Sequence, residues 1–188
     1  MTIKEKFIQT YNTHIKREGA DALLSYLMSD ACDFFRAPAS TRFHGSYEGG
    51  LFDHSLRVAR ELVNLTEKLG LMWEDTKSPI IVGLFHDLCK CDNYIYDIET
   101  NGYKYNPDII IPGHGEKSVI LLQKYIDLTD EEIACIRWHM GAYEKDPKMW
   151  EYFGRAIETY PNVLYTHTAD MIASKIGGSV RSWLKIER

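Results

Sequence analysis

Apolar residues along most of the chain recur at helical spacing and not in the alternation of a β-strand. The first two predicted helices are separated by Gly19, and the third carries a continuous apolar stripe that ends at Gly70. Thr129 and Glu132 form a capping box at the start of a later helix, and Asp146-Pro147 and Pro161 start two more. Helices are therefore expected over residues 3–17, 20–29, 51–69, 114–126 and 130–140, from 146 onward, and over 161–176.

One further helix is apolar nearly all round. It starts at Ser78-Pro79, where serine is a good N-cap and proline suits the first helical position. Residues 80–85 carry no polar side chain, which is typical of a helix buried at the centre of a fold. The apolar run ends abruptly in His86-Asp87.

Two segments break the helical pattern. Residues 30–50 contain Pro38 and several glycines and predict a long connecting loop, and loops of this length are often functional. Residues 93–106 place tyrosine-rich stretches on either side of Asn101-Gly102, which predicts a small β-hairpin. The pattern therefore predicts an all-α helical bundle with a β-hairpin insert, in one domain over 1–188. Residues 1–43 hold the N-terminal helices and the start of the connecting loop, and 44–176 hold the core.

Composition adds an ordinary globular balance with a mild acidity. The 188 residues are 45% apolar and 26% charged, with a net charge of −5 at pH 7. Strong binding to long DNA is therefore not expected. The segment Met1–Phe7 does not look like a signal peptide, and no apolar stretch approaches the ~18 residues of a membrane span. We expect a cytoplasmic protein with no membrane partner.

The four cysteines do not resemble a disulfide scaffold. Cys89 and Cys91 are too close to each other for an easy disulfide, and no second cysteine pair accompanies them at the spacing of a zinc site. Reduced, buried thiols are the expectation for Cys32, Cys89, Cys91 and Cys135.

His86-Asp87 is the feature that a purely structural interpretation explains least well. An unpaired charge at the end of a buried helix is costly, and metal coordination removes that cost. His54 lies on the buried stripe of its helix, four residues before Val58, and Asp170 lies in another apolar helix. Each has an ordinary alternative, as a hydrogen-bonded core histidine or a solvent-facing aspartate. Together the four residues favour one shared metal site.

These residues resemble the signature of the HD superfamily of metal-dependent phosphohydrolases, which is His … His-Asp … Asp. The resemblance covers roughly residues 42–176, and the segment from Gly83 to Lys90 also matches the superfamily's His-Asp-x-x-Lys form. A second motif is similar to the HD module of bacterial 3′→5′ exoribonucleases and of relaxase-associated HD domains. It reads His44-x-x-Tyr47-x-Gly49-Gly50-Leu51-x-x-His54.

The resemblance also implies a ligand set. Mononuclear members of the superfamily use only the four signature ligands, whereas binuclear members add two histidines before the last aspartate. His114, at a helix start, and His139, at a helix end, occupy suitable places; alternatively, His114 caps its helix and His139 interacts with a helix dipole. Such ligands suit Mn, Fe, Co, Ni or Zn. The binuclear assignment gives one ion to His54, His86 and Asp170, the other to His114 and His139, and makes Asp87 the bridge.

Three further residues are candidates for substrate binding. Lys90 is four residues after His86, so it is expected on the same helical face, where the resemblance implies contact with a substrate phosphate. A surface lysine is the alternative. Arg42 lies in the loop before the first ligand helix, and His167 lies in the last helix, where a hydrogen-bonded core histidine is the alternative. Asp87 and Lys90 are the expected catalytic residues.

The resulting hypothesis is hydrolysis of a phosphate ester or phosphoanhydride by a metal-bound hydroxide. The expected substrate is a nucleotide, dinucleotide or short oligonucleotide; the acidic charge favours a small one, and the exoribonuclease-like motif a nucleic-acid end. Two alternatives remain: a mixed-valent di-iron oxygenase with the same six ligands, and a nucleotide-sensing or interaction module with little catalysis. Tyrosines of the hairpin could stack on a base, although such residues more often pack a ribbon onto the body. These are Tyr94, Tyr96, Tyr103 and Tyr105.

Overall fold

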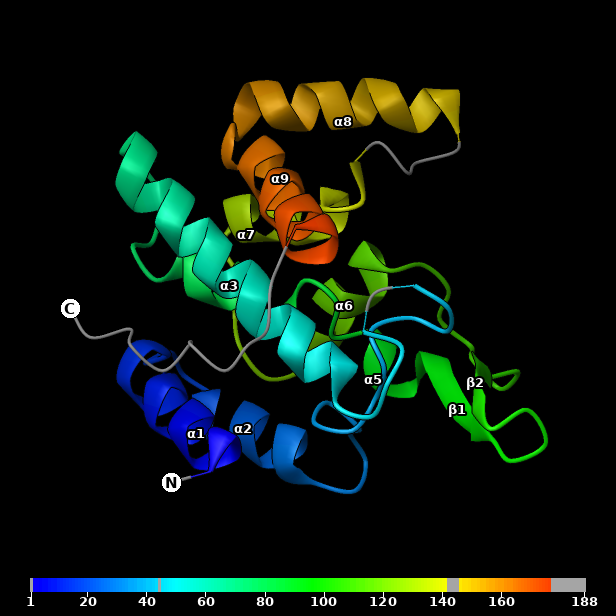
Figure 1. The fold of residues 1–188 in the computed structure, drawn as a ribbon. Helices are drawn as coiled ribbons and strands as arrows, with labels where there is room; N and C mark the ends of the chain where they lie inside the picture. Colours follow the sequence, from blue (N-terminus) through cyan, green and yellow to red (C-terminus); the bar gives the residue numbers. More distant parts are fainter. Residues whose placement is uncertain (1, 44, 142–145, 177–188) are drawn as a thin grey trace.

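The computed structural model describes residues 2–43, 45–141 and 146–176, which are mainly helical with one small β-hairpin (Figure 1). This arrangement confirms the expected all-α fold with a hairpin insert. The elements are α1 (Ile3–His14), α2 (Ala20–Met28), α3 (Gly50–Leu69), α4 (Ser78–Phe85), α5 (Lys90–Asn93), β1 (Tyr94–Asp97), β2 (Gly102–Tyr105), α6 (Gly115–Leu122), α7 (Asp130–Trp138), α8 (Pro147–Thr159) and α9 (Asn162–Lys175).

Helix α3 lies at the centre and packs against α4 and α9 (Figure 1). Its apolar stripe is buried, and α4 is buried almost all round, as its sequence predicted. Gly83 permits the close approach of these two helices, because a Cβ atom at this position would lie 2.3 Å from the Cα atom of Ala59. The helix that ends in His86-Asp87 is therefore fixed tightly against the helix that carries His54.

One hydrophobic cluster runs through the molecule from Phe7 of α1 to Ala173 of α9. Phe34 joins this cluster from the connecting loop, and its ring centroid lies 6.0 Å from that of Phe7 and 6.0 Å from that of Phe85. The loop between α2 and α3 has no helix or strand in its described part, as expected, but Phe34 anchors it in the core. The contact with Phe85 thereby fixes this part of the loop to the end of α4.

Two glycines of the predicted motif have a backbone role. Gly49 has a φ of +83°, and a Cβ atom on Gly50 would lie 1.9 Å from the carbonyl oxygen of Gly45. Neither position tolerates a side chain without a shift of the backbone. The Gly49-Gly50 pair therefore lets the loop fold back on itself where α3 begins.

Some predicted helix ends were wrong by a few residues. Helix α1 ends at His14 and not at residue 17, because Ile15 takes an extended conformation and is buried, and Arg17 turns to meet Glu132. Helix α6 ends at Leu122, and turns over 123–126 bury Ile126. Contacts between distant parts of the chain decided these ends, and helical periodicity does not contain that information.

The structure also bears on the predictions about the cysteines and about a membrane span. All four cysteines are free and buried, as expected, and the Sγ atoms of Cys32 and Cys91 lie 3.1 Å apart. Within the described ranges, no helix combines the length and the apolar character that crossing a membrane requires.

Candidate metal centre

The residues predicted as metal ligands converge where α3, α4, α6, α7 and α9 meet. His54 lies in the second turn of α3, and Asp170 lies in α9. The others stand at helix ends, where a side chain can leave the packed face: His86 and Asp87 directly after α4, His114 directly before α6, and His139 directly after α7. Together with the thiol of Cys89, which was not predicted as a ligand, their ligand atoms form three overlapping groups, namely His54/His86/Asp170, His86/Asp87/His139 and Asp87/Cys89/His114.

Asp87 occupies the middle of this arrangement. Its Oδ2 atom lies 3.6 Å from Nε2 of His54 and 3.4 Å from Nε2 of His86, while its Oδ1 atom lies 3.4 Å from Nε2 of His139. The residue is only 2% exposed. One carboxylate therefore faces histidines from three helices, with its two oxygens directed to different sides.

The backbone fixes the orientation of two histidine rings. Nδ1 of His86 lies 2.9 Å from the carbonyl oxygen of Gly83, and Nδ1 of His139 lies 2.7 Å from that of Ile136. A carbonyl only accepts hydrogen bonds, so Nδ1 donates in both cases. Both carbonyls belong to the last helical turn, where intrahelical partners run out. In the neutral tautomer, Nε2 of each ring then presents a lone pair towards Asp87.

His54 and Asp170 form a second pair of facing groups. Nε2 of His54 lies 3.1 Å from Oδ1 of Asp170 and 3.2 Å from Nε2 of His86. Burial lowers the pKa of His54 and favours its neutral form. Burial would raise the pKa of Asp170, but its hydrogen bond with His54 and the neighbouring histidines outweigh burial and lower that pKa. A neutral imidazole beside an ionised carboxylate is the combination that metal binding requires.

Lys90 meets the same carboxylate from another side. Its Nζ atom lies 2.5 Å from Oδ2 of Asp87, and the residue is 8% exposed. Burial opposes the charged form of Lys90, but the Asp87 carboxylate outweighs it and raises the pKa of Lys90. Burial likewise opposes ionisation of Asp87, and the nearby positive groups, Lys90 first, hold its pKa well below the usual range. Both groups are therefore charged at neutral pH.

The route by which Lys90 reaches this position differs from the expectation. Helix α4 ends at Phe85, and turns carry the chain from His86 to Cys89 before α5 begins. The backbone hydrogen bonds here join residues three apart, as from the N–H of Lys90 to the carbonyl of Asp87. The expectation of one continuous helical face was wrong. These tight turns place Lys90 beside the Asp87 side chain instead.

Two buried atoms bear on whether this group suits a metal ion. Oδ1 of Asp87 and Nε2 of His139 have no hydrogen-bond partner among the described residues. Leaving a buried polar atom unsatisfied costs about 1–3 kcal/mol, and metal coordination would offset that cost. Imidazole nitrogens with carboxylate oxygens are also a donor set that divalent transition metals accept. The residues fit a metal centre.

His114 stands at the edge of the centre beside a cysteine. It occupies the N-cap position of α6 but makes no side-chain capping hydrogen bond, which disfavours the alternative that it serves only as a cap. Instead its Nδ1 atom lies 3.6 Å from Sγ of Cys89, whose pKa burial raises to about 12. The sequence prediction treated Cys89 only as a buried thiol. Its place two residues after Asp87 was the available signal.

A cavity of about 280 Å³ opens onto the centre. Asp87, Lys90, His114 and Asp170 line its floor, and residues of the connecting loop, the hairpin and α9 line the rest, including Ser40, Thr41, Phe43, Tyr94 and Tyr105. The cavity is thus bounded by the segment that Phe34 anchors and by the hairpin.

Two predicted substrate-binding residues lie outside the described lining of this cavity. Arg42 is exposed, although its neighbours Thr41 and Phe43 do line the cavity. His167 is half-buried, and its Nδ1 atom lies 2.8 Å from the carbonyl oxygen of His139. His44, the first residue of the predicted motif, lies outside the described residues, as do 177–188 of the predicted domain.

The family of the protein follows from its sequence relatives. A sequence model of the HD domain matches residues 51–173, from the start of α3 into α9. The chain belongs to the HD-domain family, and the matched segment contains all six residues predicted as ligands.

One curated relative gives this family a chemical context. The chain is 31% identical over 143 residues to a protein of Methanocaldococcus jannaschii named dihydroneopterin 2′,3′-cyclic phosphate phosphodiesterase. The alignment covers 74% of this chain and 52% of the relative, so the chain spans about half of the relative's length. No solved structure matches the chain significantly.

Proposed function

We propose that this chain is a metal-dependent phosphohydrolase that cleaves a phosphate ester or phosphoanhydride in a small, nucleotide-derived substrate. The observation that carries the proposal is Asp87, a buried carboxylate that faces histidines from three helices and whose Oδ1 atom has no hydrogen-bond partner among the described residues. Membership of the HD-domain family supports this chemistry.

The proposed centre holds two divalent transition-metal ions. His54, His86 and Asp170 would hold one ion, His114 and His139 would hold the other, and Asp87 would serve both. The cluster of His54, His86 and Asp170 supports the first assignment, and Asp87 lies in the clusters that contain His139 and His114. When bound, such ions activate a water for attack at neutral pH and neutralise charge on phosphate oxygens.

The protein's own groups have separate tasks in this proposal. Lys90 offers an ammonium group on the cavity floor, where it pairs with Asp87 and can bind a substrate phosphate oxygen. His167 acts as a positioning residue, because its hydrogen bond to the carbonyl of His139 holds the turn that carries that histidine. Arg42 is exposed between Thr41 and Phe43, which line the cavity, and could meet the outer part of a charged substrate.

The substrate bond that we favour is a phosphodiester. The M. jannaschii relative is named for a 2′,3′-cyclic phosphate, which is a cyclic phosphodiester of two neighbouring hydroxyl groups. The cavity at the centre, about 280 Å³, lies just below the roughly 300–1,000 Å³ that is usual for small-molecule sites. A phosphate and its sugar-like neighbour suit that space better than a folded polynucleotide.

Metal analysis followed by a hydrolysis screen tests this function. We expect about two transition-metal ions per chain, and hydrolysis of at least one member of a panel of a generic phosphodiester, nucleoside 2′,3′-cyclic phosphates, mono- and triphosphates, a dinucleoside tetraphosphate and short single strands. A chelator should abolish the activity, and added metal should restore it. Protein that binds no metal and hydrolyses nothing would contradict the proposal, and consumption of oxygen with a bound iron pair would favour the oxygenase instead.

Replacing Lys90 by methionine should raise KM for the phosphate substrate by about 10- to 100-fold, because a charge-assisted hydrogen bond to the phosphate is lost. Steady-state kinetics on metal-loaded protein measures this effect. Lys117→Met is the matched control, since Lys117 is also a buried lysine but pairs with Asp92 and Asn93. An equal rise of KM in both variants would remove the substrate role of Lys90.

A further inference from the structure

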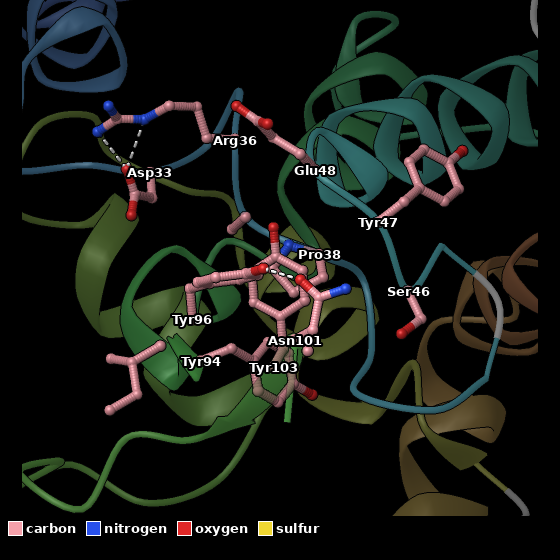
Figure 2. Close-up of a pocket in the computed structure, with 13 residues that line it drawn as sticks. Asp33, Arg36, Pro38, Ser46, Tyr47, Glu48, Tyr94, Tyr96, Asn101 and Tyr103 are labelled. Atoms are coloured by element: carbon pink, nitrogen blue, oxygen red, sulfur yellow. Dashed lines mark hydrogen bonds and ion pairs between the residues drawn. The ribbon is translucent and has the colours of Figure 1, made fainter. Parts of the chain in front are cut away.

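A second and larger cavity lies between the connecting loop and the β-hairpin. Its volume is about 780 Å³, and Tyr94, Tyr96 and Tyr103 from the hairpin line it together with Pro38 from the loop. Figure 2 shows these tyrosines gathered near Pro38, with Arg36, Asp33 and Glu48 towards the other end. Tyr94 also lines the cavity at the metal centre, so the two hollows share a wall.

The tyrosines of this wall are not all used to pack the hairpin. Tyr94 is 8% exposed and packs inward, whereas Tyr96 is 54% exposed although it lines the cavity. The rings of Tyr96 and Tyr103 meet edge to face, with centroids 5.5 Å apart and planes at 77°. Tyr96 also donates a hydrogen bond to Oδ1 of Asn101, which holds its ring in place. These rings, with Pro38 near them, offer flat apolar surfaces to a planar ligand.

The charges around the cavity disfavour a second phosphate. Arg36 is the only lysine or arginine on its described lining, and its guanidinium is paired with Asp33 at 2.5 Å. Glu48 adds a further carboxylate. Burial first, and then the charges of Glu48, Tyr96 and Asp33, raise the pKa of Tyr103, so both carboxylates act on its hydroxyl. The described lining holds two carboxylates against one arginine, and the carboxylate of Glu48 can accept a hydrogen bond from a neutral ring with N–H groups.

From this position and chemistry we infer that the hairpin cavity binds the planar heterocycle of the substrate whose phosphate lies at the metal centre. The class of ligand is a neutral bicyclic nitrogen heterocycle with N–H donors on its edge, as in a purine or a pterin. The volume of about 780 Å³ falls within the usual range for small-molecule sites. The inference deepens the proposed function and rests on it for the identity of the phosphate end.

Ligands without phosphate test the cavity separately from the catalysis. Isothermal titration of the full chain with guanosine and with neopterin should detect binding of at least one of them, and which one binds distinguishes a purine site from a pterin site. Tyr96→Ala and Tyr103→Ala should each weaken that binding by about tenfold or more, through lost stacking. Tyr96→Phe keeps the ring and should retain the binding. Ile98→Ala, at an 86% exposed position of the same hairpin, should leave it unchanged.

The outcomes separate this inference from the proposed function. Binding of guanosine or neopterin to Asp87→Asn as tightly as to the natural protein is expected, because the base-like ligand does not reach the centre. Loss of hydrolysis with retained binding would therefore leave the cavity assignment intact. The inference is overturned if neither compound binds at millimolar concentration, if both alanine variants bind as the natural protein does, or if the single-ring nucleoside uridine binds as tightly as guanosine.

Discussion

Replacing Asp87 by asparagine is expected to lower kcat on the order of 10³-fold or more and to reduce the metal content of the purified protein. The substitution keeps the shape of the side chain but removes the charge that faces His54, His86 and His139. It also replaces one acceptor oxygen by an amide nitrogen, which donates hydrogen bonds and cannot coordinate a cation. Metal analysis of the variant and single-turnover kinetics measure the two effects.

The control for this substitution is Asp92→Asn. Asp92 is an exposed carboxylate that pairs with a buried lysine, Lys117, as Asp87 pairs with Lys90. Both variants remove the carboxylate that pairs with a buried lysine, so a loss that comes only from disturbed charge pairing would appear in both. Full activity of Asp87→Asn at normal metal content would contradict the proposed role of this carboxylate.

Truncating Glu132 to alanine should lower the free energy of unfolding by about 3–5 kcal/mol, because Arg17 would lose its buried partner and Ser78 and Thr129 would lose their shared acceptor. Glu132 is fully buried, and its two carboxylate oxygens accept hydrogen bonds from Arg17 at 2.5 and 2.7 Å. It also accepts from the hydroxyl of Ser78 and from the backbone of Thr129. This carboxylate thus joins the segment after α1 to the starts of α4 and α7. Urea denaturation of the metal-free protein measures the change.

A double variant separates charge pairing from packing. Arg17→Met combined with Glu132→Leu removes both charges together, and such replacements of buried ion pairs are often close to neutral. We therefore expect the double variant to be more stable than Glu132→Ala. Glu151→Gln, which breaks an exposed pair with Arg155, should leave the unfolding midpoint unchanged. A double variant as unstable as the single one would mean that the hydrogen bonds to Ser78 and Thr129 dominate.

Local signals were sufficient to predict most of the fold. The capping box at Thr129 and Glu132, the proline after Ser78 and the Asn101-Gly102 turn each act within a few residues, and each marks a real boundary. The end of α1 was missed because it depends on Arg17, whose partners lie 58 and 115 residues further along the chain. Helical periodicity gives no information about ion pairs between residues this far apart in the chain.

The candidate site likewise contains residues that the sequence predicted and contacts that it did not predict. Buried polar residues at helix ends, such as His86 and Asp87, are visible in sequence because they interrupt apolar runs. The position of Lys90 was predicted, but the turns that produce it were not. The neighbourhood of His114 and Cys89 and the hairpin cavity arise from segments brought together only by folding. Apart from the place of Cys89 two residues after Asp87, no spacing along the chain could have predicted them.

The anchoring of His86 and His139 to the carbonyl oxygens of Gly83 and Ile136 has a consequence for how the proposed centre is loaded. In a zinc finger the ion organises the chain, and removing it unfolds the protein. In this protein, by contrast, the apolar packing of the helices orients the imidazole rings of His86 and His139 before any ion binds. Removing or exchanging the metal ions should therefore leave the protein folded. The identity of the bound ion would then depend on which metals are available around the protein.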